Sequence, residues 1–262
     1  MTDHLLTSWM TRLDRWVRLH PVAGSRAHME IAEELATALA ACGLAVTRYA
    51  HASGDLLVAR GAGAGPRLGM YGHYDVEPGG RTTMRVADNR VFGRGVADNL
   101  GPLALRLSIL ERQRRQPHLL WVIEPGEETG SRALADWLGQ ANDTWADLWL
   151  DETGYFDASG EQRFLTVDAD ERVERVVRQC ATLAAPLGIS TRTEARRLHR
   201  VGASAGFSVE SLFHSTPYLA LGPNDDSSDV HGDQESLPLN TIDLSMRQFE
   251  ALLDTLATEN LR

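Results

Sequence analysis

The sequence predicts an α/β protein, a three-layer α/β/α sandwich with a mixed, largely parallel central sheet. Two observations lead to this fold class. Short apolar runs bounded by glycine, proline or polar clusters are typical of buried strands, and segments of 10–18 residues with apolar residues at helical spacing lie between them. This alternation favours a sheet with helices packed on both faces. The 262 residues suffice for a large core, and we expect one domain over residues 1–262.

The predicted elements begin with two helices. Apolar residues at helical spacing place these helices at 3–20 and 25–42, and Gly43 gives the second one a stop signal. Strands are predicted at 44–49, 55–60, 67–71 and 118–123. Later helices are predicted at 98–115, 131–140, 170–187 and 241–258, and further elements of the same domain at 162–167 and 205–222.

The charge composition excludes several classes of function. A formal net charge of −10 argues against nucleic acid or an anionic membrane as the partner, because both require a basic face. All 26 basic residues in the Lys and Arg count are arginine, since the sequence holds no lysine. Schiff-base chemistry, pyridoxal phosphate bound to lysine and a phosphate-loop lysine are therefore excluded.

The cysteines and the hydropathy pattern indicate a cytoplasmic protein. Cys42 and Cys180 are too far apart in sequence to suggest a disulfide framework or a thiolate metal cluster. The first residues carry charges throughout and lack the apolar core and cleavage site of a secretory signal. No run approaches the 18 apolar residues of a membrane span.

Five polar motifs stand where a predicted strand ends or a loop follows it. In an open α/β sheet, ligands gather at the carboxyl ends of the strands. We therefore expect the motifs to share one site. They are GHYDVEP at 72–78, GRGVADNLGP at 93–102, EPGEETGS at 124–131, LWLDETG at 148–154 and DVHGDQES at 229–236.

Together these motifs supply the ligands that a pair of bridged zinc ions needs. Zinc binds neutral imidazole nitrogen and carboxylate oxygen, and a catalytic site keeps a position open. Spacings of 25, 30, 23 and 80 residues between the candidates exclude a zinc finger, whose ligands come in close pairs. The candidate metal ligands are His73, Asp98, Glu128, Asp151 and His231.

The first two candidates also fit plainer roles when each is taken alone. Asp75 lies two residues after His73, on the same side of an extended chain, and can accept the second ring N–H. A single histidine at a strand end is, however, more often structural. Asp98 opens the predicted helix at 98–115, where a helix N-cap is the commonest role of an aspartate. Sequence position alone does not separate the cap from a bridging ligand.

The other acidic candidates have plainer roles as well. Glu127 and Glu128 are adjacent on non-helical backbone, so one can bind metal while the other acts as a base. The alternative is an acidic cap on the helix at 131–140. His231 lies in an acidic loop, which could suggest a calcium site. The loop lacks, however, the alternating oxygen ligands of a calcium-binding EF-hand. A solvated loop is the plainer interpretation of the acidic residues around His231.

Three of the motifs resemble those of a known enzyme family. GHYDVEP, FGRGVADNLGP and EPGEETGS are similar, in order and spacing, to motifs of the co-catalytic zinc metallopeptidase family that contains aminoacylase, acetylornithine deacetylase and carnosine-type dipeptidases. Pro102 and the EETGS run are most similar to the dipeptidase branch. The similarity in layout extends to about residue 155 and resumes near residue 200.

The resemblance implies a role for each candidate ligand. Asp98 would bridge two zinc ions, with Co²⁺ or Mn²⁺ as possible substitutes. His73 and Asp151 would complete the site of one ion, and Glu128 and His231 that of the other.

The resemblance also implies the catalytic residues. Glu127 would be the general base that takes a proton from water and passes it to the leaving amine, while Asp75 would orient His73. In this family the peptide bond after the bridging aspartate is commonly cis, which predicts a cis bond between Asp98 and Asn99. The expected reaction is hydrolysis of an amide bond in a small peptide or an acylated amine.

The chain departs from the family in two places. Leu100 stands where relatives usually carry lysine. The family usually inserts a lid and dimerisation domain after the ligand that corresponds to Asp151, but only about 80 residues separate Asp151 from His231 here. We therefore expect a monomer without a lid, similar in architecture to single-domain zinc aminopeptidases.

Two other functions remain open on the sequence. A relative that has lost catalysis could serve as a metal-binding or metal-free binding module. A transferase could use the same site to pass an acyl or aminoacyl group to an amine. Glu127 discriminates against the binding module, because a degenerate relative is expected to lose its base or a ligand.

Overall fold

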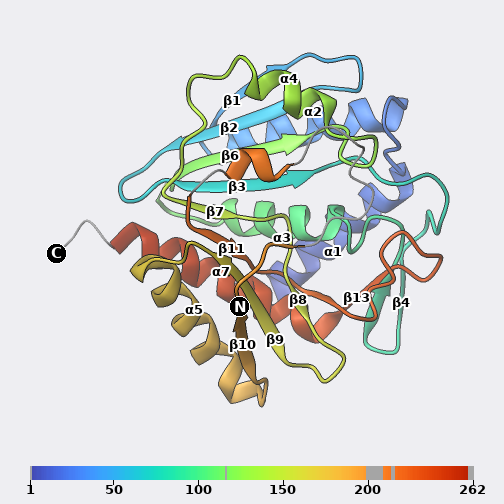
Figure 1. The fold of residues 1–262 in the computed structure, drawn as a ribbon. Coiled ribbons are helices and arrows are strands. Elements are labelled where there is room, and N and C mark those ends of the chain that lie inside the picture. The colour runs from blue at the N-terminus through green and yellow to red at the C-terminus, as the bar shows by residue number, and fades with distance from the viewer. Residues whose placement is uncertain (1, 116, 199–208, 214–215, 259–262) are drawn as a thin grey trace.

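The computed structural model describes residues 2–115, 117–198, 209–213 and 216–258. Their central feature is a ten-stranded sheet (Figure 1). The strands in spatial order are β1 (Ala45–Tyr49), β2 (Leu56–Ala62), β6 (His118–Glu124), β3 (Leu68–His73), β7 (Leu148–Leu150), β11 (Tyr218–Ala220), β9 (Gln162–Val167), β8 (Tyr155–Phe156) and β12 (Asn224–Asp225), with β10 (Thr191–Glu194) paired to β9.

The middle of this sheet is parallel and its flanks are mostly antiparallel. Strands β6, β3, β7 and β11 pair in parallel. On one flank β2 joins β6, and β1 joins β2, both antiparallel; on the other, β9 pairs antiparallel with β11 and with β8. The predicted mixed sheet is confirmed. Because β3, β6, β7 and β11 run in the same direction, the loops after them meet at one edge.

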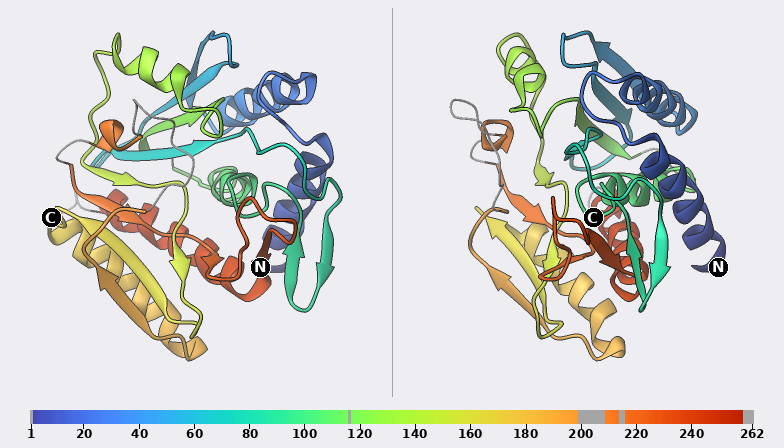
Figure 2. Two further views of the ribbon diagram at one scale, coloured as in Figure 1. Left: turned by 45° about the vertical axis from the view of Figure 1, so that its right-hand side comes forward. Right: turned by 90° about the vertical axis from the view of Figure 1, so that its right-hand side faces the viewer.

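Helices cover both faces of the sheet, as the right-hand view of Figure 2 shows. Five helices of the described part of the chain pack against one face of the sheet and share a single buried apolar cluster with it. They are α1 (Thr2–Leu19), α2 (Arg26–Ala41), α3 (Leu100–Leu110), α5 (Glu171–Ala184) and α7 (Leu239–Thr258). The other face is covered by α4 (Arg132–Leu138) and α6 (Glu210–Phe213). The three-layer sandwich is therefore confirmed.

Alternation along the central strands explains why both faces are apolar. In β2, Leu57 packs with the first cluster and Val58 with the second. In β6, Trp121 packs with the first cluster and Val122 with the second. Successive strand side chains point to opposite faces, so a strand buried on both sides is a continuous apolar run.

The predicted helices differ from the observed ones mainly at their ends. The helix expected at 98–115 is shorter, at Leu100–Leu110, and the one expected at 131–140 spans Arg132–Leu138. Helix α5 begins where Asp170 accepts hydrogen bonds from the backbone N–H groups of Arg172 and Val173, and it ends in a short 3₁₀ turn. Part of the element expected at 205–222 lies outside the described residues.

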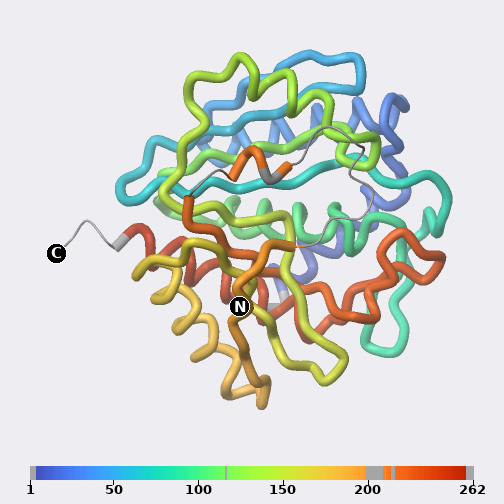
Figure 3. Tube along the Cα trace, in the orientation of Figure 1, coloured from blue at the N-terminus to red at the C-terminus, as the bar shows by residue number. Residues whose placement is uncertain are grey.

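Several short strands escaped prediction. They include β4 (Arg85–Ala87) and β5 (Arg90–Phe92), which form a three-stranded sheet with β13 (Ser236–Pro238). Figure 3 shows the connection that leads to β13 beside this hairpin. Runs of two or three residues are too short to show a hydrophobic period. This small sheet brings the loop that carries His231 next to the loop before α3.

The segment between Glu152 and His231 adds strands to the central sheet. In the part of this segment that the structure describes, β8, β9, β10, β11 and β12 all pair within that sheet. Among the described residues, no helix is long and apolar enough to cross a membrane.

Candidate metal centre

Asp98 lies between two histidines, and each of its carboxylate oxygens faces a different one. Oδ1 is 2.9 Å from Nε2 of His73, and Oδ2 is 3.3 Å from Nε2 of His231. His73 ends strand β3, whereas His231 comes from the loop before β13, at a positive φ of 66°. Asp98 is not the N-cap of α3, since that cap is Asn99, and the bond between them is cis as expected. The N-cap interpretation of Asp98 is therefore wrong.

The second ring nitrogen of His73 points to Asp75. Nδ1 lies 3.2 Å from Oδ1 of Asp75 and 3.1 Å from its backbone oxygen. A carboxylate at this position favours the ring orientation that leaves Nε2 directed at Asp98. Asp75 also accepts hydrogen bonds from the backbone N–H groups of Glu127 and Glu128, both at 3.1 Å. It thus fixes the loop after β6 relative to His73.

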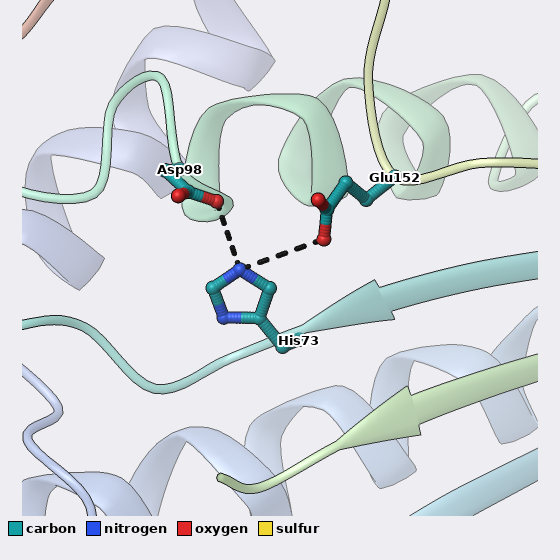
Figure 4. Close-up of side chains that lie close together, drawn as sticks. All are labelled: His73, Asp98 and Glu152. Atoms are coloured by element: carbon teal, nitrogen blue, oxygen red, sulfur yellow. Dashed lines mark hydrogen bonds and ion pairs between the residues drawn. The ribbon is translucent and has the colours of Figure 1, made fainter. Parts of the chain in front are cut away.

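Beside His73 the structure places Glu152, whereas the sequence prediction chose its neighbour Asp151. Figure 4 shows Glu152 and Asp98 both turned toward the imidazole, with Oε2 of Glu152 3.7 Å from Nε2. The carboxylate of Asp151 instead accepts hydrogen bonds from the Glu152 backbone N–H and the Tyr218 hydroxyl. Adjacent residues after a strand point in opposite directions, and here the second one reaches the site.

A second group of candidate ligands lies around His231. Nε2 of His231 lies 3.0 Å from Oε2 of Glu128, and Glu77 offers a further carboxylate oxygen within 4.8 Å of both. Glu127 is buried and lines the cavity next to Asp98. Neither glutamate caps α4, whose N-cap is Ser131. The acidic-cap alternative for this pair is therefore wrong.

The carboxylates shift the pKa values of both histidines upward. Hydrogen bonds with Asp98 and then Glu128 raise the pKa of His231 to about 10. Burial lowers the pKa of His73, but hydrogen bonds with Asp75 and Asp98 outweigh it and hold that pKa well above the ordinary value. Without metal the His231 ring is therefore protonated at neutral pH, and the protonated form of His73 is favoured. A metal ion must displace these protons, so its affinity increases with pH.

The chemistry of these groups fits two zinc ions. His73, Asp98 and Glu152 offer ligand atoms within 4.8 Å of one another, and so do Glu77, Glu128 and His231. Imidazole nitrogen with carboxylate oxygen is a ligand set that zinc accepts. Asp98 has one oxygen turned to each histidine. The raised histidine pKa values show that this part of the molecule favours positive charge.

Two residues of the site, Glu152 and Arg106, were missed by the sequence prediction. Glu152 had a weak signal, because Asp151 and Glu152 form an adjacent acidic pair like Glu127 and Glu128. Arg106 had none. It is buried in α3, donates to the backbone oxygens of Tyr71 and Asp151, and so anchors the end of β7 beneath the site.

One acidic residue of the loop around His231 contradicts the expectation of a solvated loop. The side chain of Glu235 is only 2% exposed and pairs with Arg94 at 2.7 Å. Its partner lies 141 positions earlier in the chain, so local sequence gives no sign of the pair.

A cavity of about 260 Å³ adjoins the cluster. One end is lined by Asp98, Glu127, Glu152 and His231. The rest of the lining consists of Thr153, Tyr155, Arg196, Leu198, Asn224, Asp225, Asp226, Ser228 and Val230. The lining therefore combines residues of the candidate metal centre with apolar side chains, one arginine and two further aspartates.

Comparisons with known sequences give a family match and curated relatives, among them a probable peptidase and a desuccinylase. Residues 69–255 match the profile of peptidase family M20/M25/M40. The chain is 30% identical over 128 residues to a probable di- and tripeptidase, DUG2, of Saccharomyces cerevisiae, covering 39% of this chain and 14% of that protein. It is 38% identical over 86 residues to a succinyl-diaminopimelate desuccinylase of Rhodospirillum rubrum, covering 30% and 22%. The matches thus span less than a quarter of either relative.

Solved structures share the fold along nearly the whole chain. An M20 family metallo-carboxypeptidase, Sso-CP2, from Sulfolobus solfataricus superposes with a TM-score of 0.70 at 12% identity, covering 95% of this chain and 99% of the other. The dipeptidase Dug1p of Saccharomyces cerevisiae gives a TM-score of 0.68 at 12% identity, with coverage of 98% and 97%. At such low identity these likenesses concern the fold alone.

Proposed function

The chain belongs to peptidase family M20/M25/M40, and we propose that it is a zinc-dependent hydrolase that cleaves an amide or peptide bond of a small substrate. The observation that carries this proposal is the position of Asp98, with one carboxylate oxygen turned to His73 and the other to His231. A carboxylate between two histidine-containing ligand groups is the arrangement that a pair of bridged metal ions requires.

We assign three residues to each ion. His73, Asp98 and Glu152 hold one zinc, and Asp98, Glu128 and His231 hold the other. Glu152 takes the position that the sequence prediction assigned to Asp151, because its carboxylate faces His73. When bound, the two ions supply a Lewis acid for the scissile carbonyl and lower the pKa of water.

Glu127 is the general base of this proposal. Glu127 is 6% exposed and lines the cavity beside Asp98 and His231, so its carboxylate can take a proton from water and return it to the leaving amine. Its backbone is held by Asp75, which also bonds His73. Asp75 thereby fixes the base relative to one metal ligand.

The cavity supports a small substrate. Its volume of about 260 Å³ is close to the lower limit for small-molecule sites. Tyr155, Leu198 and Val230 offer apolar surface, and Arg196, which also pairs with Glu194 at 2.9 Å, adds a guanidinium to the lining. The similar proteins are named as a di- and tripeptidase, a dipeptidase, a carboxypeptidase and a desuccinylase. We therefore propose a dipeptide, the N-terminal residue of a peptide or an N-acyl amine as substrate.

We further propose that the chain acts as a monomer without a lid. The described strands between Glu152 and His231 extend the central sheet. Substrate contacts then come from the loops that line the cavity.

A substrate panel with controlled metal content tests the proposed reaction. Dipeptides, longer peptides and N-acyl amino acids are incubated with protein loaded with zinc or cobalt, and amine release is measured. We expect hydrolysis of at least one class, loss of activity with a chelator and recovery on adding zinc. A Glu127→Gln preparation purified in parallel controls for contaminating peptidases. Absence of turnover across the panel by the fully loaded protein would contradict the assignment.

A further inference from the structure

A buried ion pair joins the two loops that carry Asp98 and His231. Nη1 of Arg94 lies 2.7 Å from Oε2 of Glu235, and their side chains are 4% and 2% exposed. Arg94 belongs to the loop before α3, and Glu235 directly precedes β13. We call this pair the Arg94–Glu235 clamp.

The carboxylate of Glu235 holds the backbone up to Asp98. Oε2 accepts a hydrogen bond from the N–H of Gly95 at 3.1 Å, in addition to that from Arg94. Oε1 accepts from the N–H groups of Ala97 at 3.0 Å and Asp98 at 3.1 Å. With four donors, the carboxylate has used all of its lone-pair directions.

The guanidinium of Arg94 holds the backbone at His231. Nη2 donates to the backbone oxygen of His231 at 2.9 Å, and Nε donates to that of Gly79 at 3.4 Å. The planar fork of arginine lets one side chain bond Glu235 and His231 at once. The clamp therefore ends at the backbone of one metal ligand on each side.

A buried ion pair is weak evidence for stability, because removing two charges from water costs several kcal/mol per ion. The directions of these hydrogen bonds indicate another purpose. Asp98 and His231 come from segments far apart in the chain, yet one oxygen of Asp98 must face Nε2 of His231 at 3.3 Å. The clamp fixes the distance between the two backbones that carry these groups.

We propose that Arg94 and Glu235 are positioning residues that set the affinity of the second zinc site, the one formed by Asp98, Glu128 and His231. This inference rests on the proposed two-zinc function. Neither side chain touches the reacting groups. Both act through the backbone of the ligands.

The variant Arg94→Lys tests this role while keeping a positive charge against Glu235. Lysine lacks the fork, so it cannot bond Glu235 and the His231 backbone in the same geometry. We expect the zinc Kd of the site formed by Asp98, Glu128 and His231 to increase about 10–100-fold, as when groups that support a metal ligand are altered. The Kd of the other zinc should change much less, because that ion shares only Asp98 with the site that the clamp supports. Titration with zinc and the Co²⁺ absorption spectrum at the second equivalent measure both.

A second variant and a matched control separate positioning from general stability. Glu235→Gln keeps the shape of the side chain but replaces one accepting oxygen with an NH2 group, which cannot accept from two of the four donors, so a similar loss is expected. Arg67→Lys is the control, because Arg67 is 6% exposed, pairs with Asp143 and lies just before β3, at the opposite end of that strand from His73. It should reduce thermal stability without changing either zinc affinity.

Three outcomes are distinguishable. Selective weakening of the second zinc in Arg94→Lys, with both affinities kept in Arg67→Lys, supports the clamp. Two zinc ions bound with wild-type affinity in both clamp variants overturn it, as does equal weakening in Arg67→Lys. If Glu235→Gln does not fold, Arg94→Lys decides. Wild-type protein that binds no second zinc would refute the proposed function itself.

Discussion

Replacing Glu127 with glutamine is expected to lower kcat by about 10²–10⁴-fold, the usual contribution of general acid–base transfer. Glutamine has nearly the same shape but cannot accept a proton. The backbone N–H of residue 127 can still donate to Asp75, so the loop and the metal ligands should keep their positions. We therefore expect two zinc ions per chain and a KM close to that of the wild type. Steady-state kinetics and metal analysis of the same preparation measure both.

The matched control for this variant is Glu174→Gln. Glu174 lies on α5, and its side chain is 61% exposed, so the change should leave kcat unaltered. Wild-type turnover by Glu127→Gln would remove Glu127 from the role of base. Loss of zinc from that variant would assign the residue to metal binding instead.

The second large effect is expected at Glu152. Glu152→Ala removes the carboxylate that faces His73, so zinc content should fall from two ions to one and kcat by roughly 100-fold or more, because the two ions act together on the reacting oxygens. Asp151→Asn should keep both ions, since an asparagine oxygen can still accept from the Tyr218 hydroxyl. A loss of about 1–3 kcal/mol in the free energy of unfolding is expected for weakening that buried network.

Comparison of these two variants decides whether the metal ligand is Asp151, as predicted from the sequence, or Glu152, as the geometry indicates. If Asp151→Asn loses a zinc ion and Glu152→Ala keeps both, the ligand is Asp151, as the motifs suggested. Metal analysis after gel filtration, together with urea unfolding of both variants, gives the answer.

The prediction of the fold succeeded where the apolar pattern is long and continuous. The strand predicted at 118–123 is observed as β6 (His118–Glu124). It was predictable because a central strand that is buried on both faces is a continuous apolar run. Two- and three-residue strands such as β8 and β12 could not be predicted, since they exist only through pairing with their neighbours.

The residues of the candidate site were likewise predicted only in part. His73, Asp98, Glu128 and His231 were candidates because they stand in ordered motifs, and the structure brings all four together. The choice between Asp151 and Glu152 depends on how the chain leaves β7, which a pattern of residue types does not encode.

The Arg94–Glu235 clamp could not be predicted from the sequence. Its residues are 141 positions apart, and each looks like an ordinary loop charge in its local sequence. A charged residue in a polar loop is usually solvated. The small sheet formed by β4, β5 and β13 brings the two loops together, and the pair is buried there.

The most direct test of the bridged metal centre is the zinc content of the wild-type chain. Metal-free protein is titrated with zinc near pH 8, dialysed and analysed by elemental analysis, with Asp98→Asn treated in parallel. We predict two zinc ions per wild-type chain and at most one tightly bound ion in Asp98→Asn, because both ions share that carboxylate. A wild-type chain that retains no zinc, or an Asp98→Asn variant that retains two with unchanged affinity, would contradict the bridge.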